Sequence, residues 1–188
     1  MNEEGMIQPA PQKRLFRAPQ PGFSTYAWAY SEAASYLSKA LKDAKADPLL
    51  ALPCAFLYRH AIEVTIKSLL VEFGSDFNIQ KRQVLKRGHN LLAQLDDLNV
   101  VAKSVGLAAS SMLVKRIEEL QKFDPLSFHS RYPESKEGKR LLSEEAASIS
   151  FEVLSAGAEE VLDELMNIGM ELDRHLLREI LTDEGILD

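Results

Sequence analysis

Residues 47–74 read DPLLALPCAFLYRHAIEVTIKSLLVEFG, and this stretch decides the fold class. Asp47 can accept hydrogen bonds from the free amides of a first helical turn, and Pro48 suits the first helical position, where its missing N–H costs nothing. Gly74 is a typical residue at a helix end. At about 100° per residue, the segment between is apolar almost all the way round, which is typical of a buried central helix. The sequence therefore predicts a core helix that ends at Phe73.

Helical spacing of apolar residues recurs on both sides of this central segment. The expected helices are 24–46, capped by Ser24 or Thr25; 89–106, beginning at His89 or Asn90; 108–122; and a long last helix after Ser143. No run alternates apolar and polar residues well enough to require a sheet. The predicted fold is all-α, an up-and-down bundle of about five helices with a long C-terminal helix.

The beginning of the chain differs in composition from the rest. Residues 1–22 contain four prolines and little periodic apolarity, so we expect a flexible arm or a segment that wraps a neighbour. Residues 23–188 are expected to form a single helical domain. The first residues lack the apolar stretch of a signal peptide, and no window approaches the roughly 20 apolar residues of a membrane span. We therefore expect a cytoplasmic protein with no membrane partner.

Composition narrows the class of partner. The 188 residues are 46% apolar and 27% charged, an ordinary globular balance, and the formal net charge is -6. This charge argues against a globally basic nucleic-acid binder, although it leaves room for a local basic patch. The single cysteine, Cys54, cannot form an internal disulfide and lies in an apolar run. We interpret it as core filling rather than a reactive thiol, because no basic residue precedes it closely enough to lower its pKa.

The central segment carries ionisable residues where a core is expected. Arg59, His60, Glu63 and Lys67 fall within about 100° of one another on the helix, and Glu63 is spaced to pair with Arg59 or His60. Unpaired burial of such charges is costly, so they satisfy one another or line a wet cleft. Both a structural ion-pair network and a functional site fit this pattern. Two ligands on one turn without a second matching pair do not predict a metal site, and no cofactor is expected.

Positive charge is concentrated between the second and third expected helices. The residues concerned are Lys81, Arg82, Lys86 and Arg87. Basic side chains that reach phosphates give salt-sensitive affinity for nucleic acid, so these four are candidates for RNA binding. A solvated loop accounts for the same pattern.

A second irregular region, residues 123–133, reads FDPLSFHSRYP. Aromatic, histidine and arginine residues without helical periodicity suggest a loop held by packing, and such loops on helical scaffolds commonly carry function. In an equally simple interpretation, Arg131 pairs with Asp124 or Glu63, while aromatic rings such as that of Tyr132 fill the end of the bundle. On that interpretation Lys67, Asp124 and Tyr132 belong to a structural polar cluster.

Three short motifs together resemble the HEPN superfamily of small helical-bundle domains. They are YRHAIEVTIKSLL at 58–70, GHNLL at 88–92, and Arg131-Tyr132-Pro133 before the long last helix. The resemblance covers most of residues 24–180 and implies a homodimer built on the C-terminal helices. Many members are metal-independent RNases of toxin–antitoxin, phage-defence and CRISPR systems. Others are binding modules or non-catalytic partners of nucleotidyltransferases.

The sequence departs from the family's catalytic pattern. RNase members carry an arginine followed closely by a histidine near the start of the last helix, and here Arg131 has no such histidine. Arg82 and His89 have six residues between them, but they precede the third helix. The RNase motif is therefore degenerate. In an active enzyme, histidine would be the general acid or base and arginine would stabilise charge on the phosphate, with Arg59, His60, Glu63, His89 and Arg131 as candidates.

Three functional hypotheses follow. The first is a HEPN-like dimeric interaction or RNA-associated module, in defence or stress response, without strong catalysis. The second is a metal-independent endoribonuclease of the toxin or phage-defence type. The third is a small-molecule-binding bundle, which requires a closed apolar cavity between the second and last helices. Expected partners are a second copy, through the apolar seam from Leu154 to Leu176; RNA; and a protein such as an antitoxin or nucleotidyltransferase.

Overall fold

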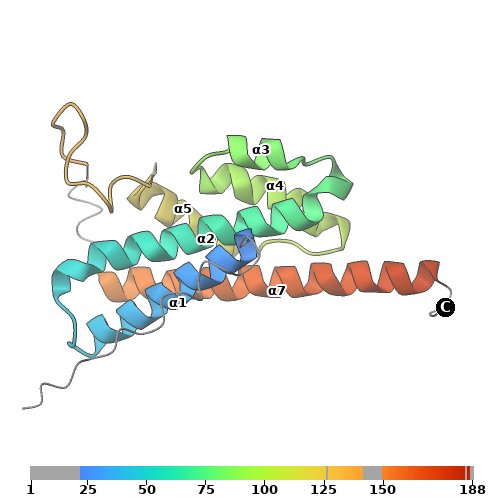
Figure 1. Ribbon diagram of the computed structural model, residues 1–188, viewed down its shortest axis with the longest axis horizontal. Coiled ribbons are helices and arrows are strands. Elements are labelled where there is room, and N and C mark those ends of the chain that lie inside the picture. The colour runs from blue at the N-terminus through green and yellow to red at the C-terminus, as the bar shows by residue number, and fades with distance from the viewer. Residues whose placement is uncertain (1–21, 126, 142–149, 185, 187–188) are drawn as a thin grey trace, which may run out of the picture.

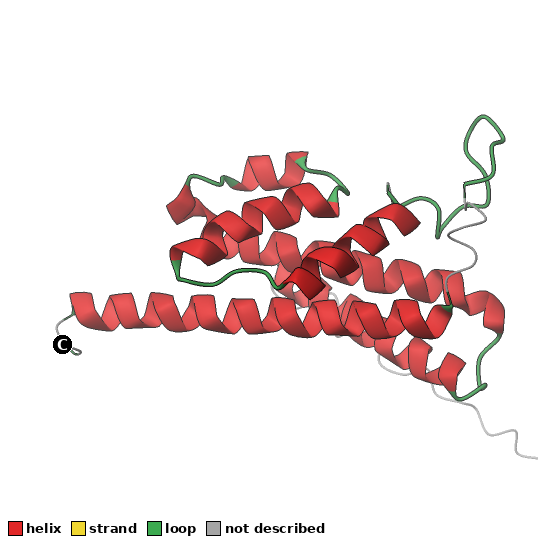
Figure 2. Cartoon of the chain, turned by 180° about the vertical axis from the view of Figure 1, so that it is seen from behind, coloured by secondary structure: helices red, strands yellow, loops and turns green. Residues whose placement is uncertain are grey.

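The computed structural model of the protein describes residues 22–125, 127–141, 150–184 and 186. Over these residues it is an all-α bundle of six α-helices, and the single isolated β-bridge joins Glu134 and Arg140 (Figures 1 and 2). The proline-rich arm, apart from its last residue, and the expected cap Ser143 lie outside the described residues.

The predicted central helix is confirmed. A 3₁₀ turn, η2 (Pro48–Leu50), leads directly into α2 (Ala51–Phe73), and Asp47 Oδ1 accepts the amide of Leu49 at 2.9 Å. Gly74 follows as the C-cap. Helix α2 packs against α1 (Phe23–Lys42) and against helices α4 and α7, described below, so it forms the middle of the bundle.

The first helix is shorter than expected. It ends at Lys42 instead of near Ala46, because the chain turns and Ala44 adopts a left-handed conformation with φ 53°. Its N-cap is Gly22, so neither Ser24 nor Thr25 caps it.

Polar side chains cap both middle helices, and of the two expected starts of α4, His89 and Asn90, the cap is Asn90. Helix α4 (Leu91–Ser104) begins after Asn90, whose Oδ1 accepts the amide of Ala93 at 3.0 Å. Helix α5 (Ser111–Phe123) begins after Ser110, whose Oγ accepts the amide of Leu113. Between them the chain turns at Gly106, where φ is 77°, a conformation that favours glycine.

The basic connector is the main correction to the predicted fold. Instead of a loop, it contains the 3₁₀ turn η3 (Gly74–Phe77) and the short helix α3 (Lys81–Lys86). Gln80 and Gln83 exchange side-chain-to-backbone hydrogen bonds in a capping box, and Val84 is fully buried beneath the helix. This additional helix raises the number from about five to six.

The last helix, α7 (Phe151–Asp183), is the longest. Its 33 residues extend about 50 Å at 1.5 Å per residue, and its C-terminal end projects beyond the other helices in both views (Figures 1 and 2). The predicted seam is buried from Ala158 to Leu172, whereas Leu176 is 41% exposed. The bundle therefore uses only the first two thirds of the helix as core.

Helices α2 and α7 lie in close contact. At Gly169 an added Cβ would lie 2.9 Å from Leu69 Cδ2. The small-molecule hypothesis required a cavity between these helices, and the contact at Gly169 gives it no support. A largely apolar pocket of about 260 Å³ lies instead between α5 and α7.

The sequence analysis expected no segment apolar enough to span a membrane, and one segment passes that test. The 26-residue segment Pro48–Phe73 is long and apolar enough to cross a bilayer by length and composition alone. In the bundle it is the central helix, half of its most apolar window is buried, and Arg59, Glu63 and Lys67 are buried along it. These are the features of a core helix, which passes the same test.

Candidate functional site: a buried ion-pair cluster beside a stacked surface

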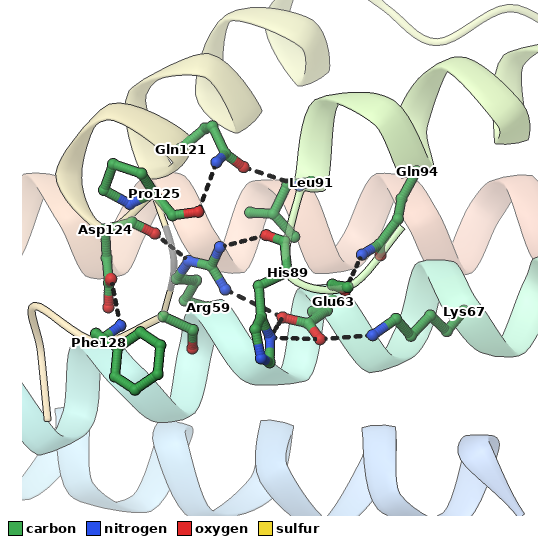
Figure 3. Close-up of polar contacts among 12 residues, drawn as sticks. Arg59, Glu63, Lys67, His89, Leu91, Gln94, Gln121, Asp124, Pro125 and Phe128 are labelled. Atoms are coloured by element: carbon green, nitrogen blue, oxygen red, sulfur yellow. Dashed lines mark hydrogen bonds and ion pairs between the residues drawn. The ribbon is translucent and has the colours of Figure 1, made fainter. Parts of the chain in front are cut away.

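Arg59 is the centre of the site, and it is completely buried. Its Nη1 donates to Glu63 Oε2 at 3.1 Å, one turn further along α2. Its Nε donates to the carbonyl of Asp124 at 2.8 Å and its Nη2 to the carbonyl of His89 at 2.7 Å. Figure 3 shows the guanidinium pointing between these three acceptors. One side chain thus joins the central helix to two connecting segments that are distant in sequence.

Glu63 is the shared acceptor of this cluster. Its Oε1 accepts from Lys67 Nζ at 2.7 Å, and both of its oxygens lie 3.0–3.1 Å from His89 Nδ1. The Glu63 side chain is 2% exposed and that of His89 is 43% exposed. We call Arg59, Glu63, Lys67 and His89 the buried ion-pair cluster, although the imidazole of His89 reaches its outer edge (Figure 3).

Hydrogen bonding decides the charge of the buried carboxylates. Burial alone would raise the pKa of Glu63, but hydrogen bonds from Lys67 and His89 outweigh burial and hold that pKa below its ordinary value. Burial likewise opposes ionisation of Asp124, and hydrogen bonds from the Ser130 hydroxyl and two backbone amides lower its pKa. Burial lowers the pKa of Arg59, an effect opposed by Glu63.

The second buried carboxylate, Asp124, organises the loop that follows α5. It is fully buried, and its oxygens accept the amides of Phe128, His129 and Ser130 at 2.7–3.2 Å, together with the Ser130 hydroxyl. Its carboxylate therefore holds the 127–131 turn, while its carbonyl holds Arg59.

Arg131 lies on the surface of this loop. It pairs with neither Asp124 nor Glu63, contrary to that alternative, because its Nε donates to the Ser127 carbonyl and its guanidinium stacks on aromatic rings. Its Cζ lies 4.9 Å from the ring centre of Phe128, 5.1 Å from that of Phe56 and 5.6 Å from that of Tyr132. Tyr132 is 51% exposed and so belongs to this surface rather than to the buried polar cluster.

His60 continues the same surface. Its imidazole is stacked on Phe56, with ring centres 5.4 Å apart, and meets Tyr30 edge-on at 4.4 Å. It does not pair directly with Glu63, the partner that its spacing suggested; His89 occupies that carboxylate. We call Tyr30, Phe56, His60, Phe128, Arg131 and Tyr132 the stacked face. It joins α1, α2 and the 127–132 loop.

The environment of His60 gives a prediction about acid stability. Burial lowers the pKa of His60 below its ordinary value of 6.5, so the unfolded chain binds a proton there that the folded chain does not. The free energy of unfolding should therefore fall as the pH drops below about 6.5. The decrease should become steeper below about pH 4.5. There the carboxylate of Glu63, and at lower pH that of Asp124, binds a proton in the unfolded chain but stays ionised in the folded chain.

Urea denaturation across this pH range measures the effect. A His60→Phe variant should lose the decrease in stability that begins near pH 6.5. The control variant His175→Asn, at a half-buried histidine of α7, should keep it. A flat stability profile between the two pH values would contradict the burial of His60.

The basic residues proposed for RNA binding lie apart from these groups. Lys81, Arg82 and Lys86 are exposed on α3. Arg87 makes two hydrogen bonds of 2.8 Å to the carboxylate of Asp97 on α4, so its charge is already paired within the protein. Among the described residues, Arg82 makes no hydrogen bond or ion pair with His89, although the two match the family spacing by count.

Three further polar side chains belong to the site, and none of them carries a recognisable signal in the sequence. Gln121 accepts the amide of Leu91 and donates to the Pro125 carbonyl, both at 2.8 Å, and so links α5 to the start of α4. Gln94 donates to the Gly88 carbonyl, and Ser130 donates to Asp124. Glutamines inside helices otherwise read as surface residues. The full burial of Gln94 and the partial burial of Gln121 are seen only in the structure.

The remaining reactive groups do not extend the site. Burial raises the pKa of Cys54 to about 11, and its Sγ lies 3.4 Å from the Ala34 carbonyl, in agreement with core filling. Within the described part of the chain, no group of three or more His, Cys, Asp or Glu side chains is placed to hold a metal ion.

Fold and site together define an all-α bundle whose central helix carries a buried ion-pair cluster. Neither a family model, a curated protein nor a solved structure gives a significant match to the chain.

Proposed function

We propose that this chain is a HEPN-like, dimeric RNA-associated module, and that its stacked face binds single-stranded RNA. The observation that carries the proposal is Arg131, an exposed guanidinium held against three aromatic rings beside the His60 imidazole. Single-stranded nucleic acids bind by stacking bases on aromatic rings and arginine planes, while cations contact the phosphates. The family resemblance implies a role in defence or stress response.

The state of Arg59 supports a binding role over strong catalysis. A catalytic arginine must reach the phosphate in the transition state. Arg59 is completely buried, and its Nε, Nη1 and Nη2 all donate to protein oxygens. These contacts are those of a structural group and support a binding role.

The RNA-binding test uses a fluorescein-labelled, mixed-sequence single strand of about 12 nucleotides and fluorescence anisotropy. Arg131→Ala should weaken binding about tenfold, the effect of losing one stacked contact and one phosphate partner. The matched control is Arg174→Ala, an exposed arginine on α7 that pairs with Glu171. Equal affinity of Arg131→Ala and the wild-type protein, or no binding by either, would refute the proposal.

A second candidate, the metal-independent endoribonuclease, is favoured by one specific observation. Glu63 bonds His89 Nδ1 and so orients the imidazole, which is 43% exposed. The other ring nitrogen, Nε2, can then act as a general base. The same labelled strand distinguishes the two functions. Cleavage that disappears in His89→Ala, with helicity intact by circular dichroism, would establish the enzyme. Binding without cleavage supports the module.

The dimer is proposed from the surface of α7. Met166, Met170, Leu177 and Ile180 are 44–60% exposed and fall on one stripe of the helix, which continues onto the part that projects beyond the bundle. A symmetric contact between two such helices would cover this stripe. It also fits the final-helix dimers that the family resemblance implies.

Light scattering tests the dimer. We expect twice the 21.0 kDa chain mass at micromolar concentration, and a shift toward the monomer in Leu177→Asp. The control Val100→Asp, at a similarly exposed apolar residue on α4, should stay dimeric. A wild-type monomer would remove the proposed interface.

A further inference from the structure

A pocket of about 590 Å³ opens beside Phe128 and Tyr132, two members of the stacked face. One wall carries the rings of Phe128 and Tyr132, which are 44% and 51% exposed. The 134–137 segment also lines the pocket, with the charged residues Glu134, Lys136 and Glu137, and Glu137 Oε2 accepts the Ser135 hydroxyl at 2.8 Å. The volume falls within the roughly 300–1,000 Å³ typical of small-molecule sites.

Hydrogen bonds hold both walls in place. On the aromatic side, the buried Asp124 carboxylate accepts the amide of Phe128 at 2.7 Å and fixes the turn that presents the two rings. On the polar side, the amide of Ser135 donates to the Lys139 carbonyl at 2.8 Å, and that of Leu141 donates to the Pro133 carbonyl at 3.1 Å. The second wall is therefore a closed turn. A ligand would meet backbone segments that are already ordered, which lowers the entropic cost of binding.

The chemistry of the walls selects the kind of ligand. Arg131 already lies against the faces of Phe128 and Tyr132, so a second cation would be repelled from the aromatic wall. A flat, uncharged ring would stack there without that penalty. Carboxylates such as those of Glu134 and Glu137 accept hydrogen bonds and cannot donate them, so a ligand edge that meets one of them presents N–H groups, while Lys136 can donate to a carbonyl oxygen.

We infer that this pocket receives one unpaired nucleobase of the bound strand and prefers guanine. Guanine presents two adjacent donors, N1–H and the exocyclic amino group, which match the two oxygens of one carboxylate. Uracil presents a single N–H between two carbonyl oxygens, which a carboxylate repels. Unpaired bases in RNA are recognised in this way, by stacking and by hydrogen bonds to their edges. The inference rests on the proposed RNA-binding function and names the part of the strand that the pocket recognises.

Titration of the full chain with guanosine 5′-monophosphate and, separately, uridine 5′-monophosphate tests the pocket without requiring a longer strand. Isothermal calorimetry should give a guanosine affinity at least about tenfold above that for uridine, as for one bidentate contact. Tyr132→Ala should weaken guanosine binding about tenfold through lost stacking. The double variant Glu134→Gln, Glu137→Gln should abolish the preference while it retains weak binding of both nucleotides.

Matched controls are Tyr36→Ala, an exposed tyrosine on α1, and Glu118→Gln, an exposed glutamate on α5, and neither should change the affinities. Equal affinities for the two nucleotides, no saturable binding, or a preference that survives the double variant would each overturn the inference. If these occur while Arg131→Ala still weakens RNA binding, the proposed function stands and only the pocket fails. Guanosine preference without RNA binding would instead support the pocket and remove the proposed function.

Discussion

Replacing Glu63 by alanine is expected to lower the free energy of unfolding by about 3–5 kcal/mol, the cost of breaking a buried pair by removing one partner. The change leaves Arg59 buried without its carboxylate, and it also removes the acceptor of Lys67 and His89. Urea denaturation followed by circular dichroism measures the loss. We expect it to be among the largest effects of any single substitution on the surface of α2 that faces the loops.

Two comparisons show whether the buried pair is the cause. Glu171→Ala removes an acceptor from an exposed pair with Arg174, and it should cost no more than about 1 kcal/mol. The double variant Arg59→Met, Glu63→Leu removes both charges, so it should be less destabilised than Glu63→Ala alone. A loss below about 1 kcal/mol for Glu63→Ala would mean that water already reaches Arg59.

Replacing Asp124 by alanine is expected to cost about 2–4 kcal/mol and to release the loop that carries Phe128 and Tyr132. The carboxylate accepts three backbone amides and the Ser130 hydroxyl, and these donors are left without an acceptor in a buried place. Because this loop builds the stacked face, RNA affinity should fall together with stability. Hydrogen exchange of the Phe128, His129 and Ser130 amides, with anisotropy on the labelled strand, checks both effects.

The control for this prediction is Asp173→Ala, which removes an exposed carboxylate from α7 and should leave stability, exchange and binding unchanged. Unchanged amide exchange in Asp124→Ala would contradict the role assigned to this carboxylate. If Asp124→Ala loses stability but binds RNA as tightly as the wild-type protein, the loop does not contribute to the proposed RNA binding.

Much of the fold follows from local sequence signals. Asp47, Asn90 and Ser110 are capping residues next to periodic apolar segments, and all three cap helices in the structure. Helix α3 was missed because it is six residues long, shows too few turns for a periodic pattern, and is capped by Gln80, a residue type uncommon at that position. The early end of α1 depends on the left-handed conformation of Ala44, which alanine does not signal.

The site was predictable only along one helix. Arg59, Glu63 and Lys67 follow one another at four-residue spacing, so their mutual ion pairs follow from helical geometry. The contribution of His89 depends on where the turn before α4 meets α2, which spacing along the chain does not encode. One of the two interpretations of the 123–133 loop placed Arg131 in an ion pair. Aromatic rings brought together from α2 and the loop surround it instead, and their proximity is a property of the tertiary structure.

The position of the Arg59 guanidinium has a consequence for local fluctuations. Its Nη2 holds the carbonyl of His89 and its Nε holds that of Asp124, so neither connecting segment can move away without breaking a bond to the same planar group. Release of one leaves the cation under-coordinated and weakens its hold on the other. The turn before α4 and the loop after α5 therefore open together as one cooperative unit, because both are bonded to Arg59.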